Sequence, residues 1–210
     1  MDRAAQLREA ELRAIRIQLK EGLGENALKS LDERGGAQEL VREQYSGRYP
    51  FELLQNANDA AIESDKRGRV RFILTDSALL VADNGFGFGI EQVDAICSLG
   101  RSSKEMGSTV GYKGLGFKSV GEITDRPQIT SGQTSFQFDA ERVHAEVGEL
   151  FGEIPAGQHF PVYAFPFPVT DADLGDDAAE VRQLLTADFT TVIRLPLRDS
   201  VEREVVGSQW

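Results

Sequence analysis

Nine glycines fall within 37 residues of this chain, between positions 85 and 121, and no other feature limits the possible folds as strongly. Apolar residues alternate with these glycines, as in GFGFGI and GYKGLGFKSV, which a flexible linker would not require. Glycine is selected where the backbone needs a positive φ or where another group must approach it closely. The stretch therefore predicts ordered turns around a site.

Length and composition indicate a globular protein with room for one domain, or for one domain with an extension. The chain has 210 residues, of which 40% are hydrophobic and 27% are charged, close to the averages of globular proteins. Its single cysteine, Cys97, excludes an internal disulfide framework and is expected to be a small buried hydrophobe. The charged N-terminus lacks the apolar region of a signal peptide, and no apolar run is long enough to span a membrane. We therefore expect a cytoplasmic protein without membrane contact.

The excess negative charge is concentrated in one part of the sequence. The chain has 34 Asp and Glu against 23 Lys and Arg, a net charge of -11, which argues against direct nucleic-acid binding. Residues 139–180 hold 10 acidic residues and one arginine, whereas residues 85–121 hold three acidic and four basic ones. The glycine-rich stretch is thus the better place for an anionic ligand.

Hydrophobic periodicity predicts helices first and a mixture of elements later. The first forty residues are expected to be helical, with a break at Gly35 and Gly36 before a second helix over 37–45. Pro50 is expected in the first turn of a further helix over 51–67.

The later segments predict the fold class. Strands are expected at RVRFILTD, SALLVADN, PQITS, TSFQFD and TTVIRLPL, and helices at IEQVDAIC and GFKSVGEIT. Residues 140–188 are expected to form a polar, acidic connection, with a solvated loop at 171–180. Because regular βαβ alternation is missing, we predict an α/β protein, a two-layer α/β sandwich whose mixed, mostly antiparallel sheet is covered on one face by helices.

The first candidate motif is a polar stripe on the helix after Pro50. Glu52, Asn56 and Asp59 are four and three residues apart, which places them on one helical face. An asparagine within a helix is unusual because it prefers caps and turns. Taken alone, the stripe is also what a solvated face of an amphipathic helix would show.

The second motif is VADNGFGFGI, in which an apolar strand ends at Asp83 and continues into glycines. A carboxylate at a strand end can accept a hydrogen bond from an exocyclic amine, and glycines let a flat ring lie against bare backbone. An Asx turn with glycines for tight geometry is the alternative.

The third motif is STVGYKGLGFKSV, with Gly111, Gly114 and Gly116 ahead of a predicted helix. Backbone N–H groups of such a loop form an anion site at a helix N-terminus, and the lysines in the motif add positive charge. The order of residues is not that of a Walker A loop. A mobile surface loop is the alternative.

Together the three motifs resemble the Bergerat-fold ATPases of the GHKL superfamily, which includes gyrase B subunits, ninety-kilodalton heat-shock chaperones, histidine kinases and mismatch-repair MutL proteins. FELLQNANDA resembles the N box, VADNGFGF the adenine-binding box and GYKGLGFKSV the ATP-lid box. The retained Glu52, and the position of His144 and His159 downstream of these boxes, argue against a histidine kinase. SLGRSSK followed by VGYKGLGFKSVGEITD is most similar to the sacsin-like and heat-shock-chaperone-like branch.

The resemblance implies a role for each matching side chain. Glu52 would be the general base that activates water, and Asn56 would offer its amide oxygen to Mg²⁺. Asp59 would shape the nucleotide pocket. Asp83 would accept a hydrogen bond from the adenine amino group, and Thr191, favoured over its neighbour Thr190, would join that network.

The resemblance also implies contacts to the base, ribose and phosphates. Ser98 stands where the chaperones carry an asparagine near the ribose and Mg²⁺, and Phe88 stands where they usually carry a smaller or unbranched residue. The remaining implied contacts are Gly85 and Gly87 beside the base, and Lys104, Gly111, Gly114, Gly116, Phe117 and Lys118 beside the phosphates.

The implied function is Mg²⁺-dependent binding of ATP and its slow hydrolysis to ADP and phosphate, used as a conformational switch through lid closure. A nucleotide-sensing module without significant turnover and a structural interaction domain without nucleotide remain as alternatives. We expect an N-terminal helical extension at 1–45, an ATP-binding Bergerat-fold domain at 46–200 and the start of a linker to a downstream domain at 201–210. Such a chain would act as a homodimer or as part of a longer polypeptide.

Overall fold

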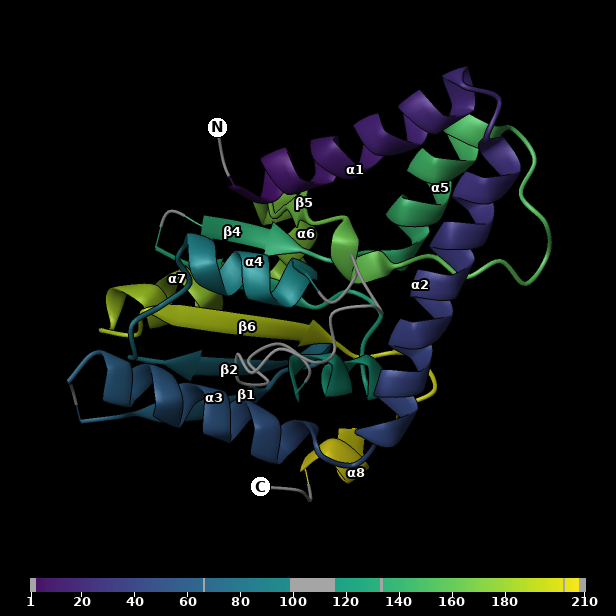
Figure 1. Cartoon of the computed structure of the whole chain (residues 1–210). Helices are drawn as coiled ribbons and strands as arrows, with labels where there is room; N and C mark the ends of the chain where they lie inside the picture. Colours follow the sequence, from purple (N-terminus) through teal and green to yellow (C-terminus); the bar gives the residue numbers. More distant parts are fainter. Residues whose placement is uncertain (1–2, 66, 99–115, 133, 202, 208–210) are drawn as a thin grey trace.

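One open, six-stranded sheet forms the centre of the fold (Figure 1). The computed structural model describes residues 3–65, 67–98, 116–132, 134–201 and 203–207. The strands of this part of the chain lie in the order β1-β2-β6-β3-β4-β5, and all five pairings are antiparallel. Their bounds are Val70–Leu74 (β1), Ala78–Asp83 (β2), Gln128–Ser131 (β3), Thr134–Gln137 (β4), Phe167–Pro168 (β5) and Thr191–Pro196 (β6). The five expected strands are confirmed, and β5 is added at the edge.

Helices cover this sheet. The α-helices are Arg3–Lys20 (α1), Gly24–Gln44 (α2), Tyr49–Glu63 (α3), Ile90–Ser98 (α4), Ala140–Phe151 (α5), Asp171–Leu174 (α6), Ala178–Thr186 (α7) and Arg203–Gly207 (α8). Three 3₁₀ helices join them, Gly116–Glu122 (η1), Val162–Ala164 (η2) and Gly175–Asp177 (η3). None of the helices described is long and apolar enough to cross a lipid bilayer.

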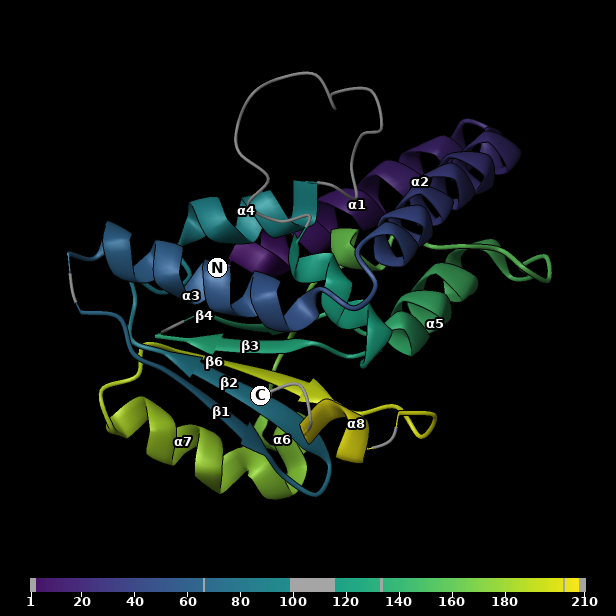
Figure 2. The same ribbon diagram turned by 90° about the horizontal axis from the view of Figure 1, so that it is seen from below.

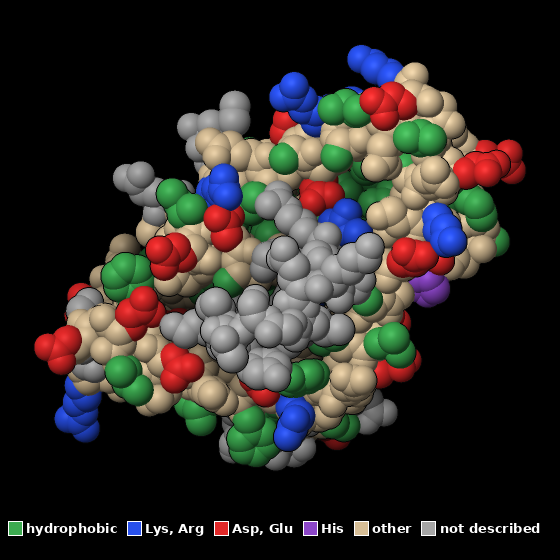
Figure 3. Space-filling model, in the orientation of Figure 1, with side chains coloured by type: hydrophobic (Ala, Val, Ile, Leu, Met, Phe, Trp, Pro, Cys, Tyr) green, Lys and Arg blue, Asp and Glu red, His purple; other side chains and the backbone are tan. Residues whose placement is uncertain are grey.

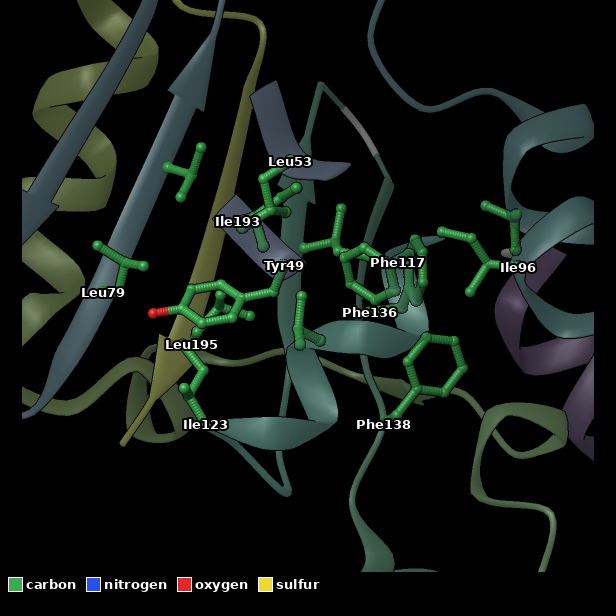
Figure 4. Close-up of a cluster of buried hydrophobic side chains, with 14 of the residues drawn as sticks. Tyr49, Leu53, Leu79, Ile96, Phe117, Ile123, Phe136, Phe138, Ile193 and Leu195 are labelled. Carbon is green, nitrogen blue, oxygen red and sulfur yellow. The ribbon is translucent and has the colours of Figure 1, made fainter. Parts of the chain in front are cut away.

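The predicted helical layer over one face of the sheet is confirmed. Figure 2 shows α1, α3 and α4 above the sheet and α7 below it. α3 begins with Pro50 in its first turn, and Leu53, Ala57 and Ala61 form its buried stripe at helical spacing. In Figure 4 side chains from α3, α4, η1 and the sheet, among them Leu53 and Phe117, converge in the main core.

α7 adds a smaller cover on the opposite face, and the sequence of β2 explains it. All six residues of β2 are buried. Leu79 and Val81 belong to the main core, whereas Ala78, Leu80 and Ala82 pack in a separate cluster with side chains of α7. Because alternate residues of a strand point to opposite faces, this continuous apolar run requires a cover on both sides.

The expected break at Gly35 and Gly36 is wrong, because α2 continues through both residues. The chain turns earlier, between α1 and α2. A Cβ built on Gly35 would lie 2.6 Å from the backbone nitrogen of Phe160, while one on Gly36 would meet no atom within 4 Å. Gly35 therefore serves close packing of α2 against the segment before η2.

The expected connection over 140–188 is also more structured than its composition indicates. It contains α5, η2, β5, α6, η3 and α7, and the expected solvated loop at 171–180 is helical. Thr170 and Asp173 form a reciprocal capping box at the start of α6. Asp177 is 6% exposed and forms an ion pair of 2.7 Å with Arg194 of β6. Several of the acidic residues thus serve caps and a buried pair.

The two N-terminal helices pack on the rest of the molecule. Ala4 and Leu7 of α1 join the main core, and Leu12 and Ile15 pack with Leu31 of α2 and with side chains of α5 and β5. In Figure 1 α2 and α5 lie beyond one end of the strands.

Candidate functional site

A cavity of about 380 Å³ lies between α3, α4, η1 and the point where β2 ends beside the start of β6. Its volume is in the range of small-molecule sites. Six of the residues predicted from the sequence line it, five from the three motifs and Thr191 from the later strand, namely Asn56, Asp59, Asp83, Gly87, Phe117 and Thr191. Segments far apart in the sequence therefore converge on one cavity.

α3 supplies the polar side of the cavity. Asn56 and Asp59 line it one turn apart, and the buried Ala57 between them lines it too. Glu52 is not among the lining residues. Its carboxylate instead lies against the first residue of η1, since a Cβ built on Gly116 would overlap Glu52 Oε2. The expected base is thus beside the end of the glycine-rich stretch.

Asp83 is the buried acid of the cavity. It is the last residue of β2 and is 8% exposed, and one carboxylate oxygen accepts a hydrogen bond from the Gly85 N–H at 2.9 Å. Burial raises the pKa of Asp83 to about 6, and this hydrogen bond opposes the rise. The other oxygen remains as an acceptor for a ligand.

Thr191 pairs with Asp83 in the antiparallel register of β2 and β6. Its hydroxyl lies 2.9 Å from Ser131 Oγ on β3, and Ser131 also accepts from the Phe88 N–H at 2.9 Å. The neighbouring Thr190 hydroxyl donates to the Gly85 carbonyl at 2.7 Å. Thr191 thus lines the cavity, whereas Thr190 stabilises the glycine turn after Asp83 through its hydrogen bond.

The glycine turn after Asp83 is attached to α3. A Cβ built on Gly85 would lie 2.7 Å from the Ala60 carbonyl carbon, and the Phe86 N–H donates to the Ala60 oxygen at 2.9 Å. Gly87 has φ +91, and a Cβ there would lie 2.9 Å from Ser131 Oγ. Gly85 therefore permits packing of the turn on the helix, and Gly87 faces the cavity.

Lys118, which was predicted at the phosphates, does not line this cavity. Lys118 is 2% exposed and lines a second cavity instead. Ser98 is the last residue of α4. Lys104, Gly111 and Gly114 lie outside the described residues.

The described lining of the cavity is acidic. Asp59, Glu63, Asp83 and Glu91 contribute four carboxylates, and the lining residues that the structure describes include no Lys or Arg. Glu63 and Glu91 of this lining, and Ser131 beside Thr191, were not predicted from the sequence, because none of the three lies in a recognisable motif. Such a lining favours an uncharged hydrogen-bonding group and a cation over a bare anion.

Asn56 and Asp59 offer oxygen ligands of the kind that Mg²⁺ accepts. Within the described part of the chain, no group of three or more His, Cys, Asp or Glu side chains could hold a metal ion by itself. A magnesium ion here would therefore need further ligands from a substrate, as is usual at phosphate sites.

Over the face seen in Figure 3, acidic and basic side chains of the described residues are interspersed. They do not gather there into one broad patch of a single sign among the residues drawn in colour. The acidity of the cavity is thus a local property of its lining.

Comparison with known proteins identifies the family of this chain. The family model described as the Sacsin domain matches residues 38–209, which include every described residue of the cavity lining. The protein NO VEIN of Arabidopsis thaliana is 38% identical over 103 residues, which are 48% of this chain and 4% of that protein. The chain thus spans a small part of the curated relative that it matches.

Proposed function

The chain belongs to the Sacsin domain family, and from its cavity we propose that it is a Bergerat-fold nucleotide-binding module of the GHKL type. In this proposal it binds ATP with Mg²⁺ and hydrolyses it slowly to ADP and phosphate. Lid closure on ATP would then serve as a conformational switch in a homodimer or a longer polypeptide.

The observation that carries the proposal is the meeting of three motifs in one cavity. Asp83 at the end of β2, Asn56 and Asp59 on α3, and Phe117 on η1 all line it. A buried carboxylate between Thr191 and a glycine turn suits the amino edge of an adenine, because the ionised oxygen is an acceptor only. Guanine carries an acceptor at that edge and would be disfavoured.

The remaining roles follow from position. Asn56 would hold Mg²⁺ through its amide oxygen, and the ion when bound would neutralise phosphate charge. Glu52 would accept the proton of the attacking water, a contribution of about 10²–10⁴-fold in typical cases. Its place beside Gly116 supports this role, because base and lid segment then meet at the phosphate end.

The test is Mg-ATP binding and phosphate release by the whole chain. We expect one saturable site by calorimetry, and a loss of affinity of about 10- to 100-fold in Asp83→Asn, which removes a charged acceptor. Glu52→Gln should retain binding but lower phosphate release by about 10²–10⁴-fold. Glu43→Gln changes an exposed acid on α2 and should alter neither quantity.

The outcomes separate the candidate functions. Equal phosphate release by the wild type and Glu52→Gln would refute the base role. Binding without release from the wild type would favour the nucleotide-sensing module, which the family membership also accommodates. A wild type that fails to bind Mg-ATP would eliminate both the ATPase and the nucleotide-sensing module. The structural interaction domain would then be the remaining candidate function.

A further inference from the structure

A second cavity, of about 260 Å³, lies between α2, η1 and η2. Residues of η1 line both cavities. Lys118 reaches into it with 2% of its surface exposed, and its ammonium nitrogen lies 5.1 Å from the centre of the Tyr163 ring. The Tyr163 ring gives this ammonium a cation–π contact, and an electrostatic interaction with Cys97 acts to raise its pKa. Burying a charged group is nevertheless costly, so the arrangement calls for an explanation.

Gln38 of α2 is a second incompletely satisfied group of this cavity. It is 8% exposed, and its Oε1 accepts a hydrogen bond from the Tyr163 N–H at 3.3 Å. That bond fixes the amide orientation and leaves Nε2 as a donor. Within the part of the chain that the structure describes, this buried Nε2 has no acceptor.

The other charges of the cavity are already paired. Arg42 is bonded to Glu39, and Arg198 is bonded to Asp125. The charged side chains that line the cavity therefore sum to one positive charge, that of Lys118, with histidines neutral.

The rest of the wall is largely apolar. Phe138, Phe160, Val162 and the ring of Tyr163 contribute to it. A ligand suited to this cavity would have one negative charge, two hydrogen-bond acceptors and a small apolar body. A carboxylate matches the two donors and the single positive charge. A phosphate dianion would bring more acceptor oxygens than there are donors and more negative charge than the cavity can neutralise.

We propose that this second cavity is a binding site for a small organic monocarboxylate, whose carboxylate accepts hydrogen bonds from Lys118 and Gln38. The site is distinct from the proposed nucleotide cavity and does not depend on it. Burial lowers the pKa of Lys118 to about 7, and a bound carboxylate would offset that desolvation.

The first experiment titrates the whole wild-type chain with benzoate at pH 6, where the ammonium is protonated, and with benzamide as the uncharged comparator. We expect benzoate to bind saturably with a one-to-one stoichiometry and benzamide to bind about tenfold more weakly or worse. In nuclear magnetic resonance spectra, benzoate should shift the side-chain amide signals of Gln38 and the backbone signal of Tyr163. Shifts confined to Asp83 and Thr191, or equal affinity for benzamide, would overturn the proposal.

The second experiment uses variants. Lys118→Met keeps the length of the side chain and should lower benzoate affinity by about tenfold or more. Lys29→Met removes an exposed lysine of α2, 77% accessible, and should leave the affinity unchanged. An unchanged affinity in a folded Lys118→Met would refute the site.

Two further measurements keep the proposal testable if Lys118→Met does not fold. Gln38→Leu should also weaken the binding of benzoate, because it removes the second hydrogen-bond donor. Unaltered binding in this variant would count against the proposed site. Inorganic phosphate should fail to displace benzoate from the wild type at equal concentration. Equal displacement by phosphate would overturn the assignment to carboxylates.

Discussion

Asp83→Asn should stabilise the free protein while it weakens adenine recognition. Asp83 is 8% exposed, and burial raises its pKa from 3.8 to about 6. At about 1.4 kcal/mol for each pKa unit, the ionised carboxylate costs the folded state about 3 kcal/mol. An asparagine oxygen can accept the same hydrogen bond from Gly85 but carries no charge. The variant should therefore be more stable above pH 6, by up to about 3 kcal/mol.

The gain should depend on pH in a direction set by the raised pKa. Below pH 3.8 the side chain of Asp83 is protonated in both the folded and the unfolded chain, so the cost disappears. As the pH rises towards 6 the unfolded chain ionises first, and the wild type loses stability relative to Asp83→Asn. We expect a difference of about 1 kcal/mol at pH 4.5 and about 3 kcal/mol at pH 8.

Urea unfolding of both proteins, followed by circular dichroism at several pH values, measures this difference. Asp76→Asn is the matched control, because the Asp76 side chain is fully exposed in its pair with Arg203 and should change stability by less than about 0.5 kcal/mol. A gain that does not vary between pH 4.5 and pH 8, or a loss of stability at pH 8, would refute the reasoning about Asp83.

Three further predictions concern packing and the base. Gly35→Ala should destabilise the protein by about 1–3 kcal/mol, because the added methyl group meets a neighbouring backbone. Gly36→Ala has open space around it and should stabilise the protein by about 1 kcal/mol. Urea midpoints of the two variants that move in the same direction would contradict this. Gly116→Ala should displace the Glu52 carboxylate and so lower phosphate release more than Mg-ATP affinity, which kinetics and calorimetry can compare. Arg194→Met should cost about 3–5 kcal/mol in thermal unfolding, because it leaves a buried carboxylate unpaired; a cost below about 1 kcal/mol would count against a stabilising pair.

The part of the site that could be predicted from sequence is the part set by local periodicity. A spacing of three residues is enough to place Asn56 and Asp59 on one face of a helix. Likewise, an apolar run that ends in a carboxylate and glycines predicts Asp83 at a strand end. The structure brings these side chains into one cavity with Thr191.

Residues that contribute through tertiary contacts could not be found in this way. Ser131 belongs to an ordinary strand sequence, and only the β3–β6 register, which pairs it with Thr191, reveals its role. Gly35 had the appearance of a helix break because sequence alone cannot distinguish a glycine that ends a helix from one that admits a neighbouring backbone.

Lys118 shows a third kind of information that the sequence alone did not supply, the direction in which a side chain points. It follows Phe117 directly, and both were expected at the phosphates. In a 3₁₀ helix, with about three residues per turn, neighbouring side chains point about 120° apart. Phe117 therefore lines the first cavity and Lys118 the second.

This division has a consequence for the proposed nucleotide site. The described lining of the first cavity carries four carboxylates, which suit a base and a metal ion but would repel a bare triphosphate. With Lys118 in the other cavity, compensation for phosphate charge has to come from Mg²⁺ and from residues 99–115, whose sequence contains three Lys and Arg against one Glu. Adenosine should accordingly depend little on Mg²⁺ for binding, whereas ATP should depend on it strongly. A calorimetric comparison of the two ligands with and without Mg²⁺ would detect that difference, and equal dependence would contradict an acidic base-binding end.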